Sequence, residues 1–225
     1  MLFSTTTTLL GLAAAASAAT LPSQFARRQG GSVSVTPHDR YSSSVGVLGC
    51  KINVNRVAYW PSFPGCDDFC VKVTANGRSV NLLKIDQSGG AFDISYDAWN
   101  YLVTGQGAEE NPTQGGGIDA TYETVDPSEC ADIITEPEGK LAFSAANSMN
   151  FVTSCGADTW IGQNFALYNI VNTQCTYGYD EVCQMPDPSQ GNQPTCPHQL
   201  GLTDPLTSQP VWNIDYGTGE KSLAT

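Results

Sequence analysis

Three aromatic residues, Tyr59, Trp60 and Phe63, lie in a proline-bounded stretch just before Cys66. Aromatic side chains stack on the apolar faces of sugar rings, which adds affinity without any charge. The same residue types also build small protein cores, because a buried aromatic ring contributes a large apolar area. The stretch is therefore either a sugar-binding loop or a part of the core.

Other catalytic motifs are missing from the sequence. There is no Gly-x-Ser-x-Gly elbow, no phosphate loop and no His-Glu-x-x-His pair. A Ser-His-Asp triad would have to use His38 or His198, and both fall in segments that we expect to be poorly ordered. We expect no cofactor.

Cysteine usage indicates a disulfide framework. Zinc is the alternative, because Cys66 and Cys70 have tolerable spacing, but no second close pair follows and the chain has only 2 histidines. We therefore expect four disulfides and no metal site. Four cysteines precede residue 131 and four follow it, which predicts two halves that are each held by their own disulfides. The first set is Cys50, Cys66, Cys70 and Cys130, and the second is Cys155, Cys175, Cys183 and Cys196.

The beginning of the chain has the pattern of an export leader. Residues 1–19 hold an apolar run and end in small residues that a signal peptidase accepts, and the run is too short to span a membrane. The Arg27-Arg28 pair is either a second processing site or two solvated arginines. Residues 20–45 are expected to form a propeptide and a flexible arm, since 29–45 are rich in Ser and Gly. We expect a secreted, extracellular protein with no membrane anchor.

The charge is strongly acidic, with 22 Asp and Glu against 10 Lys and Arg and a net charge of −12. Such a chain is repelled by nucleic-acid phosphates and by anionic lipid surfaces, so neither is an expected partner. Neutral or cationic partners remain. The low share of charged residues, 14%, suits an extracellular β-rich fold with many turns.

Short runs of β-prone residues at 51–54, 71–74, 80–85 and 120–125 predict strands. Asn76-Gly77 is a strong hairpin signal, because both residues tolerate positive φ. A short helix should begin after Ser95, bury Trp99 and end at Gly105, followed by an exposed loop at 106–117. Residues 141–155 and 159–175 fit either a buried helix or strands, and 186–225 should be loosely ordered apart from Cys196.

The segments follow one another in a characteristic order. Cys70 enters a strand, a hairpin follows, the next strand ends at Ile85-Asp86-Gln87, and a glycine turn leads to Phe92-Asp93-Ile94-Ser95, a helix and a closing strand. In this order the chain resembles the barwin-like barrels, which include barwin, the expansin amino-terminal domain, loosenins, small endoglucanases and rare lipoprotein A transglycosylases. The resemblance spans residues 46–130. It implies a mainly β fold, a six-stranded double-psi β-barrel with a short helix, to which the sequence adds a disulfide-stapled extension at 131–185 packing on the barrel.

The resemblance also assigns a role to Asp93. It matches an acid that protonates a glycosidic oxygen in catalytic members, which requires a raised pKa. The alternative is structural: Asp93 or Ser95 caps the helix, and Asp86 ties down the glycine turn. Ala91 replaces the His of expansins, and Pro61 stands where the endoglucanases carry a second acid.

Inverting hydrolysis needs two carboxyl groups, and only Asp67, Asp68 and Asp97 remain as substitutes for the second one. The sequence therefore favours a non-hydrolytic protein that binds or loosens cell-wall glycan (chitin, cellulose or peptidoglycan) with Asp86, Asp93 and the Tyr59, Trp60 and Phe63 side chains. One alternative is a glycan-cleaving enzyme that uses Asp93 alone. The other is a secreted effector or inhibitor whose barrel is a scaffold for binding a host or competitor protein.

Overall fold

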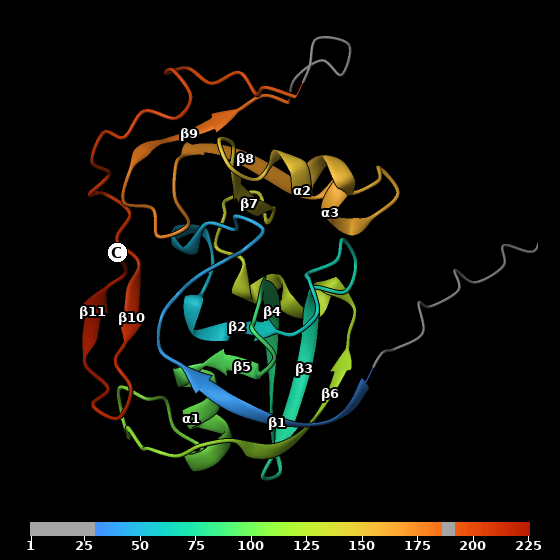
Figure 1. Cartoon of the computed structure of the whole chain (residues 1–225), viewed down its shortest axis with the longest axis vertical. Helices are drawn as coiled ribbons and strands as arrows, with labels where there is room; N and C mark the ends of the chain where they lie inside the picture. Colours follow the sequence, from blue (N-terminus) through green and yellow to red (C-terminus); the bar gives the residue numbers. More distant parts are fainter. Residues whose placement is uncertain (1–29, 186–191) are drawn as a thin grey trace, which may run out of the picture.

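The computed structural model describes residues 30–185 and 192–225 (Figure 1). The expected signal peptide at 1–19 and the Arg27-Arg28 processing site lie outside the described residues. No helix in the described part of the chain is long and apolar enough to cross a membrane.

Six strands close into a barrel, in the order β1-β5-β2-β4-β3-β6. The mainly β, six-stranded barrel expected from the sequence is confirmed. Two neighbouring pairs, β1 with β5 and β2 with β4, run parallel, and the others are antiparallel. The strands are β1 (Gly30–His38), β2 (Val57–Trp60), β3 (Cys70–Ala75), β4 (Arg78–Gln87), β5 (Phe92–Ser95) and β6 (Ile118–Thr124).

The stretch expected to be a flexible arm contains β1 instead. Gly30–His38 pairs with β6 on one side and with β5 on the other, so it completes the barrel. Its inward residues Val33 and Val35 pack in the barrel interior, whereas Ser32 and Ser34 face outward. The Ser and Gly composition suggested a flexible arm, but the outward face of a half-buried strand needs no apolar side chain.

The hairpin and the helix form where the sequence predicts them. Asn76 and Gly77 both have positive φ, 51° and 72°, and join β3 to β4. Helix α1 (Tyr96–Thr104) follows β5 directly, and Gly105 ends it in the left-handed conformation at φ 87°. Trp99 is buried beneath it.

The strand predicted at 51–54 is wrong. Two 3-10 turns, η1 (Gly49–Lys51) and η2 (Val54–Arg56), occupy this stretch, and Ile52 makes only an isolated bridge to Ile134. The side chain of Asn53 accepts a hydrogen bond from the amide of Asn55, 3.1 Å away, and so starts η2. This local bond competes with strand pairing.

The extension contains both kinds of element that its apolar pattern left open. A sheet in the order β7-β8-β9 lies beside two short helices, at the end of the barrel opposite α1 (Figure 1). A 3-10 segment, η3, leads into it from β6. The elements are η3 (Pro127–Ile133), β7 (Leu141–Ser144), α2 (Met149–Ser154), α3 (Trp160–Gln163), β8 (Phe165–Ile170) and β9 (Gly178–Cys183).

The disulfides do not divide the chain into two separately stapled halves, contrary to the expectation from the sequence. Cys50 pairs with Cys175 and Cys66 with Cys155, so two bridges cross from the barrel segment into the extension. The other bridges, Cys70–Cys130 and Cys183–Cys196, each stay on one side. Buried residues of both parts form one continuous apolar core between them, including Tyr59, Leu83, Phe143 and Leu167. The extension is therefore part of the fold of the barrel.

The end of the chain is also ordered, contrary to the expectation of a loose tail. Within its described part, β10 (Trp212–Ile214) and β11 (Lys221–Leu223) pair as an antiparallel hairpin. Val211, Ile214 and Ala224 are buried, because the hairpin packs along the side of the barrel near α1 (Figure 1). Residues 186–191 lie outside the described chain.

Candidate functional site

Four residues form a row across neighbouring strands of the barrel. In register, Thr36 of β1 lies opposite Asp93 of β5, Asp93 lies opposite Tyr59 of β2, and Tyr59 lies opposite Asp86 of β4. The hydroxyl of Thr36 donates a hydrogen bond to the Asp93 carboxylate. The barrel thus brings together three of the residues that the sequence singled out, Asp86, Asp93 and Tyr59.

Tyr59 separates the two carboxylates but is not exposed. Its side chain is only 3% exposed, and its hydroxyl donates to the carbonyl oxygen of Arg40 at 3.1 Å. Burial raises the pKa of Tyr59 far above its ordinary value, and the negative charges of Asp86 and Asp93 raise it further. The residue is therefore a neutral, packed tyrosine, with no face open to a sugar in this conformation.

The Asp86 carboxylate ties down the chain around it. It accepts hydrogen bonds from the hydroxyl of Ser42 at 2.5 Å, from the amide of Ser44 at 2.9 Å and from the amide of Gln87 at 2.8 Å. These bonds fix residues 42–44 against the end of β4. Asp86 therefore has a structural contact, but not the expected one: the glycine turn is held by the Ser88 hydroxyl, which accepts a hydrogen bond from the amide of Gly90 at 3.3 Å.

Trp60 and Phe63, the other aromatic candidates, differ in their exposure. Trp60 lies on β2, not in a loop, and its ring is 3% exposed in the barrel interior against Tyr122, with ring centroids 4.6 Å apart. Its expected role in sugar binding is a core role instead. Phe63 is 53% exposed, although its ring packs edge-to-face with that of Phe151, with centroids 6.0 Å apart.

The substitute carboxylates are each committed to a structural contact. Asp97 pairs with Arg56 at 2.6 Å and also accepts the amide of Ala108, which holds the loop after α1. Asp68 pairs with the buried Lys84 at 2.8 Å. Asp67 accepts the amide of Trp160 at 2.7 Å at the start of α3. None of these contacts supplies a second catalytic acid beside Asp93.

A groove of about 680 Å³ runs over the outward face of β1, β6 and the end of β3. Its volume is within the range of small-ligand sites. Asp119 is its only ionisable side chain. The polar lining consists of hydroxyl, amide and carboxylate groups, from Ser32, Ser34, Thr74, Asn76, Asp119 and Thr121, and the remaining lining residues are Val33, Ala75, Gly77 and Ala120.

Strand register explains how these groups converge. Ser34 lies opposite Asp119, and Thr121 lies opposite both Ser32 and Thr74, so the side chains share one face of the sheet. Ser32, Ser34, Asp119 and Thr121 are exposed. Such a surface is built to exchange hydrogen bonds with a largely uncharged, polar ligand.

Sequence reasoning missed the groove residues, although a signal was present. Residues 32–35 alternate Ser and Val, which is the period of a half-buried strand, and residues 119–121 also alternate polar and apolar side chains. The high Ser and Gly content of the arm hid this pattern. The described residues contain no group of three or more His, Cys, Asp or Glu side chains that could hold a metal ion.

Comparisons with known proteins point to one family. A sequence model of the family described as Cerato-platanin matches residues 34–133, which include most of the barrel. The protein named Allergen Asp f 15, from Aspergillus fumigatus, is 30% identical over 122 residues, covering 44% of this chain and 76% of that protein.

Two solved structures also match the chain. The solution structure of the fungal elicitor cerato-platanin is 26% identical with a TM-score of 0.35, covering 45% of this chain and 98% of that one. The crystal structure of cerato-platanin 3 from M. perniciosa is 17% identical with a TM-score of 0.31, covering 44% and 98%. The barwin-like and expansin-like resemblance was a coarser, related assignment. The chain belongs to the cerato-platanin family.

Proposed function

We propose that the chain is a secreted protein that binds cell-wall polysaccharide without hydrolysing it. The observation that carries this proposal is the 680 Å³ groove, because its polar lining is almost entirely uncharged and exposed. A polyhydroxylated sugar chain offers donors and acceptors in every ring, so it matches a surface of hydroxyl and amide groups. Four disulfides support an oxidising, extracellular setting.

Several features argue against hydrolysis as the main activity. Asp93 bonds to Thr36, Asp86 is held by three donors, and the buried Tyr59 lies between the two in register. The groove lining contains neither carboxylate. Inverting hydrolysis activates a water between two acids. In this row, the buried Tyr59 occupies the position between Asp86 and Asp93.

The proposal is tested by pull-down on insoluble chitin, cellulose and peptidoglycan. We expect retention on at least one polymer, and loss of retention for Thr121→Arg, whose long side chain fills the groove. Thr203→Arg, an exposed position away from the groove, is the matched control and should bind like the wild type. No retention of the wild type on any polymer would sink the proposal.

The same samples test the enzyme alternative. Soluble sugar released by the wild type but not by Asp93→Asn would support proton transfer by Asp93. Release that is equal in both proteins would exclude this role, and no release at all agrees with a binding protein.

A protein-binding scaffold is the second candidate function. It is favoured by the β10–β11 hairpin, which packs beside Tyr59, one of the residues that the sequence assigned to sugar binding. One matching structure is that of a protein whose name says that it is an elicitor. If the wild type binds no polymer yet forms a stable complex with a purified host-surface protein, the scaffold function replaces glycan binding.

A further inference from the structure

The polar face of β1 continues beyond the groove. Ser32 and Ser34 line the groove, and Thr36 and His38 follow at the same two-residue spacing on the same face of the strand. The ring of His38 lies against the ring of Tyr59, with centroids 4.4 Å apart. The face therefore leads from the open groove, past the bond between Thr36 and Asp93, to a cluster of aromatic side chains.

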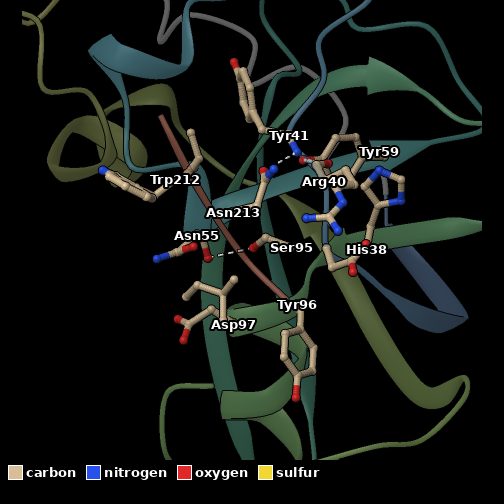
Figure 2. Close-up of a pocket in the computed structure, with 13 residues that line it drawn as sticks. His38, Arg40, Tyr41, Asn55, Tyr59, Ser95, Tyr96, Asp97, Trp212 and Asn213 are labelled. Carbon is tan, nitrogen blue, oxygen red and sulfur yellow. Dashed lines mark hydrogen bonds between the residues drawn. The ribbon is translucent and has the colours of Figure 1, made fainter. Parts of the chain in front are cut away.

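The hairpin closes the far end of this face. Trp212 and Asn213 of β10 enclose, together with His38, Tyr59 and Ser95, a cavity of about 10 Å³, which is about the space of one water molecule. Figure 2 shows β10 passing beside Ser95, with Asn213 turned toward Tyr41. No further sugar ring fits there while the hairpin is in place.

The covered surface has the composition that the open groove lacks. Three tyrosines, Tyr41, Tyr59 and Tyr96, line the small cavity and are at most 5% exposed. Asn55 and Ser95 add polar groups beside them (Figure 2). Aromatic rings next to a few polar groups are typical of ligand sites, whereas the lining of the open groove contains no aromatic side chain.

The hairpin is held by contacts that can be released. Asp215 pairs with Arg40 at 2.7 Å and Lys221 with Glu109 at 2.8 Å, and the side chains of both pairs are about a third to a half exposed. The side chain of Asn213 accepts the amide of Tyr41 at 2.9 Å. The last cysteine of the chain is Cys196, so no disulfide ties the hairpin to the barrel.

We propose that the β10–β11 hairpin is a lid over an aromatic subsite that extends the glycan-binding groove. The closed protein binds a short segment of sugar in the open groove. The open protein also binds the next rings of the same chain, against Tyr41, Tyr59 and Tyr96. This inference rests on the proposed function, because it concerns the length and regulation of the same site.

The test loosens the lid in the full-length chain. The Asn213→Ala/Asp215→Ala variant removes the Tyr41 contact and the Arg40 ion pair. Lid opening is read from hydrogen exchange at Gly115, whose amide donates to the hydroxyl of Tyr216 at 2.6 Å. We expect exchange about tenfold faster, because about one buried hydrogen bond and one ion pair are lost.

Binding is then measured by calorimetry with the dimers and hexamers of N-acetylglucosamine and of glucose. For the sugar that the wild type binds, we expect the hexamer to bind the variant about three- to tenfold more tightly, with unchanged dimer affinity. Leu223→Ser, an exposed position on β11, is the matched control and should behave like the wild type. Ile214→Ser opens the lid by a different change and should reproduce the gain.

The outcomes separate the two proposals. Wild-type binding with no gain in either variant, although exchange at Gly115 shows that the lid is open, overturns the lid and leaves the groove. Exchange that stays slow in both variants also overturns the lid, because the hairpin is then no movable element. If no sugar binds the wild type or the variants, the proposed function fails and the lid fails with it.

Discussion

The two parts of the carboxy-terminal extension are attached to the barrel in different ways. The β7-β8-β9 sheet is joined to it by the bridges Cys50–Cys175 and Cys66–Cys155, and its buried side chains share one core with the barrel. The β10–β11 hairpin adds only Val211 and Ala224 to that core and Ile214 to the barrel interior, and it is otherwise held by two partly exposed ion pairs. Exposed ion pairs contribute little to stability.

The two modes of attachment indicate that one extension serves two purposes. The sheet completes the apolar core, so its loss would unfold the barrel. The hairpin covers polar and aromatic side chains and buries few apolar residues of its own. Segments with few buried contacts are the ones that open locally. Four predictions test the comparison.

The largest effect is expected from removing a bridge between barrel and sheet. The Cys50→Ser/Cys175→Ser variant opens a connection with a sequence separation of 125 and should lose about 4 kcal/mol of unfolding free energy. The midpoint of thermal unfolding, followed by circular dichroism, should fall by about 10 °C. Removing Cys183–Cys196, with a separation of 13, should cost less. Equal losses of unfolding free energy in the two variants would contradict the stronger role assigned to the bridge between barrel and sheet.

The second prediction concerns an ion pair between barrel and sheet. Lys51 is 8% exposed, lies 2.7 Å from Asp180 of β9, and sits over the ring of Tyr168 at 4.7 Å. Lys51→Met removes the cationic partner of Asp180, which then keeps only the hydrogen bond from Gln209, and should cost about 2 to 3 kcal/mol in chemical denaturation. Lys140→Met, which removes an exposed pair with Glu138, is the control and should cost less than about 1 kcal/mol.

The third prediction moves to the hairpin. Ile214→Ala removes a side chain that is 4% exposed and packs in the barrel cluster, which should lower the free energy of hairpin opening by about 2 kcal/mol. Because the hairpin opens locally, the free energy of global unfolding should change much less. Hydrogen exchange measures the local opening and chemical denaturation measures the global unfolding. Leu223→Ala on the exposed face serves as the control. A loss of global stability as large as the local loss would contradict the account.

The smallest effect is a pH dependence of the hairpin. The hydroxyl of Ser222, and then Arg40, lower the pKa of Asp215 below its ordinary value of 3.8. A lowered folded-state pKa means that the contact stabilises above the ordinary pKa and is lost as the pH falls through the folded-state value. Exchange at Gly115, corrected for intrinsic rates, should therefore speed up below about pH 4. Asp215→Asn should abolish this step, and a step that survives the substitution would assign it to another group.

Much of the barrel could be predicted because its signals are local. Asn76-Gly77 specifies a tight turn by positive φ, and Gly105 ends α1 for the same reason. β1 was missed because its pairing is set by β5 and β6, which are distant in the sequence, whereas β10 and β11 pair only with each other and are too short to show a period. Ser32 and Ser34 need no apolar character on the outward face, and β10 and β11 are each only three residues long.

The candidate site was predicted in part. Register places Asp86, Asp93 and Tyr59 in one row, but Tyr59 and Trp60 are both buried. β2 lies between two cores: Tyr59 packs toward the extension and Trp60 packs in the barrel interior. The unbroken apolar run Val57–Trp60 is the pattern of a strand buried on both faces, whereas a sugar-binding strand would show alternation. The bridges that bring the extension onto β2 could not be paired from the sequence alone.

The central claim, that the outward face of β1, β6 and β3 binds glycan, is tested most directly by a nuclear magnetic resonance titration. The full-length protein is titrated with the hexamer of the sugar whose polymer retains it. We predict that the largest amide shifts fall on the groove residues Ser32, Ser34, Asn76 and Thr121, and that they vanish in Thr121→Arg. Saturating shifts confined to other surfaces, or no shifts at all, would contradict the account.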